Sequence, residues 1–331
     1  MTDTRFVAFD LETSKPIRDF NDWERQRPLG ISCAATLDSG GSLVLWHGPE
    51  QPDGRLGDRM SPAECRRLAS YLLQMHASRY IVVTWNGLAF DLDILAEECN
   101  SMTLRRLLAE MALEHTDIFF ALLCETGFLV KLDAVAREMG LSGKLDGVCG
   151  EDAPLMWAED RKAQDTVLNY VGQDAYLTAE LYRCVLDQQV LRWSTRSGRP
   201  KHCRWENGYV PNVSASLQLP EPDMSWMVDP PSRAGFCAWI HKALPDKNIL
   251  PLTAMQYRQG QPKPSPQSPR PWTTDEEQRL IDAFDTGASV DDLAVALGRS
   301  VNAITVKLHR LGRVLPGERR MGDLPPRSQS Y

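Results

Sequence analysis

The pattern of apolar and polar positions in the first 190 residues predicts an α/β domain. Short apolar runs bounded by turn residues are typical of buried strands, and we expect such strands at residues 5–10, 30–37, 42–47 and 80–85. Longer stretches with helical spacing predict helices at residues 62–77, 91–99, 103–114, 117–125, 132–139 and 161–188. Three strands, a helix, a strand and then a run of helices favour a mixed sheet flanked by helices.

The pattern changes beyond this domain. Residues 193–205 have the composition of a basic hairpin with a Gly-Arg-Pro turn, and residues 232–244 predict one short helix. A stretch rich in Pro, Gln and Ser follows, which is typical of a linker stiffened by its prolines. A compact, helix-periodic segment comes next, and the last residues predict a disordered tail. We therefore divide the chain into residues 1–190, 191–257, 258–271, 272–313 and 314–331.

The composition is that of a folded protein with an uneven charge distribution. Of the 331 residues, 43% are hydrophobic and 24% are charged, which excludes wholesale disorder. The formal net charge is −7, with a balance of −11 over residues 1–195 and +4 over residues 196–331. A basic second half on an acidic first half is a weak indication of a nucleic-acid partner.

The cysteines and the N-terminal sequence indicate the compartment. The eight cysteines are scattered, without a Cys-x-x-Cys pair or a zinc-ligand spacing, which is typical of reduced thiols in a cytosol. The sequence begins without a basic and apolar signal segment and has no apolar run near the roughly 18 residues that span a bilayer. We expect a soluble cytoplasmic protein with no membrane partner.

Acidic residues recur where expected elements begin or end. Asp10 and Glu12 are two positions apart at the end of the first strand, so both carboxylates point to one face. Asp91 lies near the first turn of a helix, after an Asn-Gly break, where the helix dipole favours a carboxylate. Tyr170 and Asp174 share one face of the last helix, because they are four residues apart. Taken singly, each feature has an ordinary structural explanation as solvated surface or capping residues.

The ordered set is more specific than its parts. It reads D-x-E on the first strand, N-G-x-x-F-D after a later strand, and Y-x-x-x-D on a late helix. This set resembles the tyrosine-bearing subclass (DEDDy) of the DEDD superfamily of 3′–5′ exonucleases. It is similar to the set in the proofreading domains of family-B DNA polymerases. The resemblance implies a ribonuclease-H-like fold with a mixed five-stranded sheet flanked by helices, and the periodic C-terminal segment adds a small all-α module. It covers about residues 5–188.

The resemblance also implies a reaction and roles for residues. The expected reaction is metal-dependent hydrolysis of the 3′-terminal phosphodiester bond, which releases nucleoside 5′-monophosphates. Two divalent cations, Mg²⁺ or Mn²⁺, would serve as cofactors, and such hard ions take oxygen ligands. By the family pattern, Asp10, Glu12 and Asp174 hold the ion that carries the attacking water, and Asp91 contributes to the second ion. Tyr170 orients the water, and the candidate substrate-binding residues are Thr13, Asn86 and Phe90.

Two further polar residues lie between these motifs. His115 and Asp117 could have a functional role, but we favour a structural or helix-capping role for both. The basic hairpin at residues 192–205 leaves two interpretations open. It guides a single strand by charge and stacking, or it is a solvated hairpin packed by its tryptophans.

The C-terminal segment predicts three short helices with a tight turn before the last. Its W-T-x-(D/E)-E opening and its G-R-S-x-x-A-I run resemble the Myb/SANT-like helix-turn-helix, which implies a third helix that faces DNA. The alternative is a helical module that docks onto a protein partner, which the acidic first helix favours. The candidate DNA contacts are Arg299, Asn302, Thr305, Lys307, His309, Arg310 and Arg313.

These observations favour a 3′–5′ exonuclease attached to a DNA-binding module. We favour DNA over RNA because of the polymerase-like motifs and the C-terminal segment, although the catalytic motifs themselves do not separate the two polymers. A 3′–5′ exoribonuclease on the same fold is the nearest alternative. A non-catalytic nucleic-acid-binding or regulatory protein that retains the fold is the second, and the complete set of acids disfavours it.

Overall fold

The chain forms two compact units, Met1–Gly260 and Gln261–Tyr331, which are described separately. The description comes from a computed structural model. It covers residues 4–18, 23–143, 150–195, 198–205, 208–227 and 230–247 of the first unit, and residues 272–313 of the second unit except 287, 298, 300–303, 305, 306, 309 and 312. The expected linker at residues 258–271 and the expected tail at residues 314–331 lie outside the described residues.

A mixed five-stranded sheet forms the centre of the first unit, as the exonuclease resemblance implies. Its strand order is β3-β2-β1-β4-β5. Strand β1 pairs antiparallel with β2 and parallel with β4, while β2 pairs antiparallel with β3 and β4 parallel with β5. The strands are β1 (Phe6–Thr13), β2 (Ile31–Asp38), β3 (Leu43–His47), β4 (Ile81–Thr84) and β5 (Thr116–Asp117).

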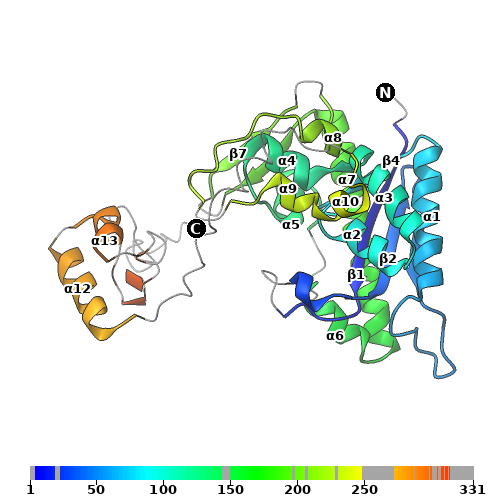
Figure 1. Ribbon diagram of the computed structural model, residues 1–331, viewed down its shortest axis with the longest axis horizontal. Helices are drawn as coiled ribbons and strands as arrows, with labels where there is room; N and C mark the ends of the chain where they lie inside the picture. Colours follow the sequence, from blue (N-terminus) through cyan, green and yellow to red (C-terminus); the bar gives the residue numbers. More distant parts are fainter. Residues whose placement is uncertain are drawn as a thin grey trace, which may run out of the picture. The chain divides into compact units, whose positions relative to one another are not determined.

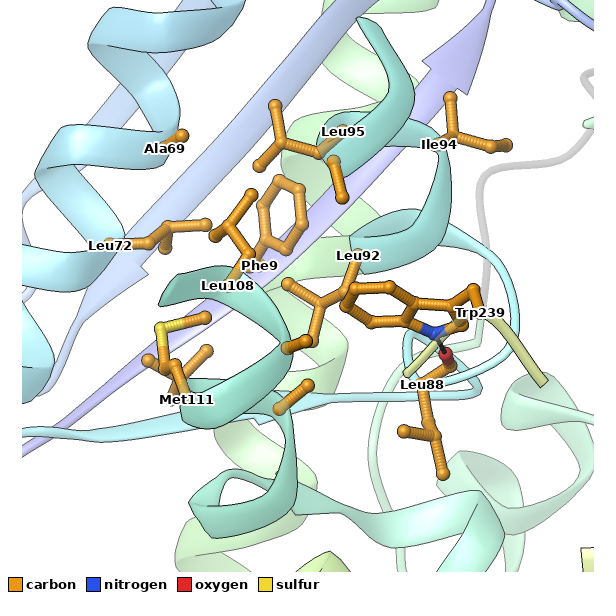
Figure 2. Packing of buried hydrophobic residues seen from close by; sticks show 14 of the residues in the cluster. Phe9, Ala69, Leu72, Leu88, Leu92, Ile94, Leu95, Leu108, Met111 and Trp239 are labelled. Atoms are coloured by element: carbon orange, nitrogen blue, oxygen red, sulfur yellow. Dashed lines mark hydrogen bonds between the residues drawn. The ribbon is translucent and has the colours of Figure 1, made fainter. Parts of the chain in front are cut away.

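Helices cover both faces of this sheet (Figure 1). Because side chains alternate along a strand, Phe9 and Leu11 of β1 join one core, and Phe6 and Ala8 join another. The first core is filled by α1 (Pro62–Ala77), α2 (Asp91–Glu98) and α3 (Met102–Glu114), and Figure 2 shows Phe9 among their side chains. The second core and a third, adjacent one are filled mainly by α4 (Ile118–Thr126), α5 (Leu132–Glu138), α6 (Ala153–Trp157) and α7 (Arg161–Gln188).

Local sequence signals explain where the long helices begin. Ser61 caps α1 in a capping box with Glu64, and Pro62 occupies the first helical position, where its missing N–H costs nothing. Asp160 caps α7, since its Oδ1 accepts a hydrogen bond of 2.8 Å from the Ala163 N–H. Both helices have the predicted bounds. The short α6, the 3-10 helix η1 (Trp23–Gln26) and the two-residue β5 were not predicted.

Residues after the last long helix complete the same unit. The basic hairpin consists of β6 (Leu191–Ser194) and β7 (Pro200–Cys203), and α8 (Val213–Ser216) follows. The predicted single helix at 232–244 is wrong in one respect: Cys237 separates α9 (Arg233–Phe236) from α10 (Ala238–Ala243). Trp239 of α10 enters the first core, where its Nε1 donates a hydrogen bond of 2.7 Å to the Leu88 carbonyl (Figure 2).

The second unit begins with two helices, α12 (Thr274–Asp285) and α13 (Val290–Leu297). Thr273 caps α12 in a capping box with Glu276, as its sequence predicts. Further helical residues follow between 304 and 310. Together these segments bury a small apolar core of Leu280, Leu293, Ile304 and Leu308. Among the described residues of the chain, no helix combines the length and apolar character needed to cross a membrane.

Candidate active site

Asp10 and Glu12 lie on the strand at the middle of the sheet. They share the face of β1 that carries Phe6 and Ala8, which is the side covered by α7. Glu12 is buried and sits opposite Cys33 of β2 in the strand register. Burial raises the pKa of the Cys33 thiol well above its ordinary value, and the nearby Glu12 carboxylate raises it further. The expectation that both acids point to one face therefore holds.

Asp91 lies directly against this strand. It is the first residue of α2, and its Oδ1 accepts a hydrogen bond of 2.9 Å from the N–H of Leu11, the residue between the two strand acids. The Asp91 pKa is raised to about 7: burial is the largest cause, the charges of Asp117 and Asp174 add to it, and the Leu11 hydrogen bond opposes it. Asp91 is therefore linked to the strand of Asp10 and Glu12 by a backbone hydrogen bond, and the charge of Asp174 on α7 acts on its carboxylate.

Tyr170 and Asp174 face inward from α7, and both side chains are buried. A Cβ atom on Gly150 would lie 3.7 Å from the Tyr170 hydroxyl oxygen and 3.9 Å from both Glu12 carboxylate oxygens. The tyrosine hydroxyl and the glutamate therefore converge on one point beside Gly150. The structure thus gathers residues from β1, α2 and α7 that are up to 164 positions apart in the sequence.

A tight loop between β4 and α2 sets the position of Asp91. Asn86 adopts a positive φ of 68°, and a Cβ on Gly87 would lie 2.6 Å from the Cβ of Thr84, so only glycine fits there. The buried Asp117 carboxylate accepts hydrogen bonds from the N–H groups of Asn86 at 3.0 Å and Leu88 at 2.8 Å. It also caps α4 by accepting from the Phe120 N–H at 3.0 Å. The expected capping role of Asp117 is confirmed. In addition, Asp117 supports the loop between β4 and α2, which the sequence did not predict.

The other polar residue between the motifs, His115, has a structural role. Its Nδ1 lies 2.6 Å from the Ala112 carbonyl, and its Nε2 lies 3.1 Å from the Thr84 hydroxyl. Because a carbonyl only accepts, Nδ1 carries the proton and Nε2 accepts from Thr84. Burial lowers the His115 pKa, since it disfavours the charged ring.

The candidate substrate-binding residues occupy the edge of this arrangement. The Thr13 hydroxyl donates to the Lys15 carbonyl at 2.9 Å, which gives it a local backbone partner. The Phe90 ring packs against Trp23 at 5.4 Å between ring centres. A cavity of about 260 Å³ lies beside the loop and is lined by Trp23, Ala89, Asp93, Phe236 and Trp239, among others. Its aromatic lining was not apparent from the sequence, because the residues come from distant segments.

Asp93 belongs to a different network from Asp91. It forms an ion pair with Arg27, whose second nitrogen reaches Glu97 at 2.8 Å, and it lies 3.9 Å from Arg105. Burial nevertheless raises its pKa, against the opposing effect of Arg27. Asp93 therefore anchors the segment at Arg27 to α2.

The donor chemistry of the site suits a hard divalent cation. Asp10, Glu12, Asp91 and Asp174 offer only carboxylate oxygens, which such ions prefer. The charges of Asp117 and Asp174 contribute to the raised pKa of Asp91, and a cation would relieve such repulsion. Across the described residues, however, no three acidic, histidine or cysteine side chains are arranged as a ready cluster of ligands. The fit is therefore one of chemistry and position.

In the second unit, three of the candidate DNA contacts pair with acids of the first helix, α12. The Arg299 guanidinium pairs with Glu276 at 2.9 Å and lies 4.0 Å from the centre of the Trp272 ring. Lys307 pairs with Glu277. The candidates Asn302, Thr305 and His309 lie outside the described residues, Arg310 is exposed, and Arg313 pairs with Asp285 at 2.6 Å.

Comparison with known proteins adds a family match and a structural likeness. Residues 58–186 match a family of the RNase_H superfamily, a segment that contains Asp91, Tyr170 and Asp174 but begins after β1. No curated protein matches the sequence. The family B DNA polymerase from the hyperthermophilic archaeon Pyrobaculum calidifontis aligns with a TM-score of 0.42 and 18% identity, over 65% of this chain and 28% of the polymerase.

The first unit thus has a mixed five-stranded sheet flanked by helices, consistent with a ribonuclease-H-like α/β fold, and its residues 58–186 match the RNase_H superfamily.

Proposed function

We propose that the protein is a metal-dependent 3′–5′ exonuclease that acts at the 3′ end of nucleic acid, with DNA as the favoured polymer. One observation carries the proposal: the Asp91 carboxylate is hydrogen-bonded to the backbone between Asp10 and Glu12. The approach of Tyr170 and Glu12 to one point beside Gly150 supports it. The match of residues 58–186 to the RNase_H superfamily supports nuclease chemistry in general.

Each residue would have a distinct role in the reaction. Asp10, Glu12, Asp91 and Asp174 would hold the cations, which lower the pKa of a bound water and stabilise charge on the phosphate. Tyr170 would hold the attacking water by its hydroxyl, since that group and the Glu12 carboxylate both lie near the position of an added Cβ at Gly150. Asp117 accepts hydrogen bonds from backbone N–H groups. It would act by fixing the loop that carries Asn86 and leads to Asp91.

Two alternatives remain distinct from this proposal. An exoribonuclease would use the same residues on a different polymer. A nucleic-acid-binding protein that retains the fold would bind without hydrolysis.

For the C-terminal unit, the ion pairs of Arg299 and Lys307 with α12 favour docking onto a protein over contacts with phosphates, because these charges are already compensated.

A degradation assay tests the proposal. The full chain is incubated with 5′-labelled single-stranded DNA or RNA and Mg²⁺ or Mn²⁺, beside Asp10→Ala and Asp174→Ala. We expect a ladder of strands shortened from the 3′ end that disappears in both variants, and the preferred polymer separates DNA from RNA. Binding of either polymer without cleavage, equal in all three proteins, would contradict the proposal and leave the binding protein as the better account.

A further inference from the structure

A row of three aromatic rings leads from the core of the first unit to solvent. The indole of Trp226 is 59% exposed, and Leu129, next to Phe128, is 52% exposed. Trp226 packs on Phe128 with 5.5 Å between ring centres, and Phe128 packs on the buried Trp193 of β6 at 5.7 Å. A large exposed ring that is braced from beneath in this way presents a flat apolar surface to a ligand.

Close packing fixes the backbone beneath this row. Gly127 ends α4 with a positive φ of 74°, and a Cβ there would lie 2.9 Å from the Met224 Cγ and 3.5 Å from the Asp223 carbonyl oxygen. The segment that carries Trp226 therefore lies directly on the turn that precedes Phe128. A turn from Met224 to Met227, with an N–H to carbonyl bond of 2.9 Å, surrounds Trp226 itself.

Positive charge lies beside the rings. The Lys201 ammonium of β7 is 5.6 Å from the centre of the Phe128 ring. Residues 191–205 contain five Arg and Lys residues and no Asp or Glu. Arg192, Arg199, Lys201 and Arg204 are exposed, whereas Trp193 and Trp205 are buried, so the tryptophans of the hairpin pack inward as in one of the two interpretations of its sequence. Figure 1 shows β7 beside α4, on the side of the first unit away from α1.

We propose that Trp226, Phe128 and Lys201, with the exposed bases of the hairpin, form a binding surface for single-stranded nucleic acid. An exposed indole can stack on an unpaired base, and the neighbouring cations neutralise phosphates. A duplex would offer phosphates but no free base faces. The inference rests on the proposed function, because it names how the exonuclease would hold the strand away from the hydrolysed end.

Binding without hydrolysis tests this surface. The full chain is titrated, in EDTA, into a fluorescein-labelled oligothymidylate or oligouridylate of about 20 nucleotides, long enough for several stacking contacts, and anisotropy is measured. Trp226→Ala should weaken binding about tenfold, the loss expected for one stacked base, while Trp226→Phe should retain most of it. Lys201→Ala should weaken binding less and lower its salt dependence. The two oligonucleotides separate DNA from RNA.

Matched controls come from α3, which lies outside this surface. Met102 is 90% exposed, and Arg106 is exposed as well. Met102→Ala therefore removes an exposed apolar side chain, and Arg106→Ala removes an exposed charge, while Trp226 and Phe128 are left unchanged. Both should bind like the wild type. Thermal melting of each variant shows whether it is folded, and Lys201→Ala and Trp226→Phe keep the test valid if Trp226→Ala unfolds.

The possible results separate this inference from the proposed function. If Trp226→Ala binds both oligonucleotides as tightly as the wild type while the wild type still hydrolyses strands, the inference is wrong and the proposed function stands. If binding depends on Trp226 but no strand is hydrolysed with either cation, the inference stands alone. Self-association of the wild type that Trp226→Ala abolishes, without oligonucleotide binding, would assign the surface to a second copy and overturn the inference.

Discussion

The Asp117 carboxylate supports the loop beside the candidate site. Its buried carboxylate accepts three backbone hydrogen bonds, two from the loop before Asp91 and one from the first turn of α4. The motifs in the sequence locate Asp10, Glu12, Asp91, Tyr170 and Asp174 but give no indication of this support. Asp117 lies 29 to 31 positions from the loop it holds, and only the parallel pairing of β4 with β5 brings the two together.

Asp117→Ala should destabilise the first unit strongly. It would leave three buried N–H groups without their acceptor, and we expect the free energy of unfolding to fall by about 3 kcal/mol or more. Asp117→Asn should cost less, because one oxygen can still accept. Urea denaturation measures both. Asp165→Ala on α7, which removes an exposed acid paired with Arg161, should change the free energy by less than about 0.5 kcal/mol. Equal effects of Asp117→Ala and Asp165→Ala would contradict the assigned role.

His115 should make stability fall in mild acid. Its pKa is lowered in the folded protein. Below about pH 6.5 the imidazole of His115 is therefore protonated in the unfolded chain but stays neutral in the native state until a lower pH. The native state is therefore favoured above that pH and progressively loses stability below it. His115→Gln removes this titration while other groups still titrate, so the wild type should lose more stability between about pH 7 and 5 than the variant. Parallel pH profiles from urea denaturation would show that His115 is not the cause.

At the scale of elements, the sequence predicts most of the first unit. The strands β1 to β4 and the helices α1 to α5 and α7 lie within a few residues of their expected bounds, because each is an apolar run bounded by turn residues or a stretch with helical spacing. The missed elements carry too little pattern. Strand β5 has two residues and α6 has five, so neither completes a recognisable repeat. The expected helix at 232–244 is interrupted at Cys237, just after Gly235, a weak helix former.

The turn between β4 and α2 should tolerate no side chain at Gly87. An added Cβ would lie 2.6 to 2.8 Å from three side-chain atoms of Thr84, whose hydroxyl is held by His115. Gly87→Ala should cost about 1–3 kcal/mol, as overpacking does. Gly172 provides the control, because its added Cβ would meet Leu45 at an ordinary 3.6 Å. Gly172→Ala should stabilise the helix α7 by about 0.5–1 kcal/mol. Both values come from thermal or urea denaturation, and a neutral Gly87→Ala would contradict the close contact.

At the scale of the whole molecule, the extension after α7 is part of the first unit. Val213, Leu217, Trp239, Ile240 and Leu244 are buried in the core that also contains Phe9 and Leu11 of β1. The sequence alone predicts these segments as a hairpin and a short helix, because short apolar runs do not reveal which core they enter. Which core these segments enter is decided by tertiary packing, which depends on the whole sheet.

Truncated chains should show that the first unit melts independently of the second and that it needs the extension after α7. A chain of residues 1–260 should melt like the first unit of the full chain, since the boundary between units lies at Gly260. A chain of residues 1–190 should lose cooperative melting, because it leaves the first core without its residues from α8 and α10. Circular dichroism during heating measures both. A cooperative transition of residues 1–190 at the temperature of the longer chain would show that the extension is dispensable.

Two acids of α2 allow the most direct test of the account. Asp91 and Asp93 are both buried and lie two positions apart, on either side of Leu92, but only Asp91 contacts the strand of Asp10 and Glu12. The measurement is 3′–5′ hydrolysis of a 5′-labelled single strand with Mg²⁺ or Mn²⁺ by the full chain, by Asp91→Asn and by Asp93→Asn, each shown to be folded by its melting curve. We expect hydrolysis by the wild type and by Asp93→Asn, and none by Asp91→Asn. Hydrolysis by all three proteins, or by none, would contradict the account.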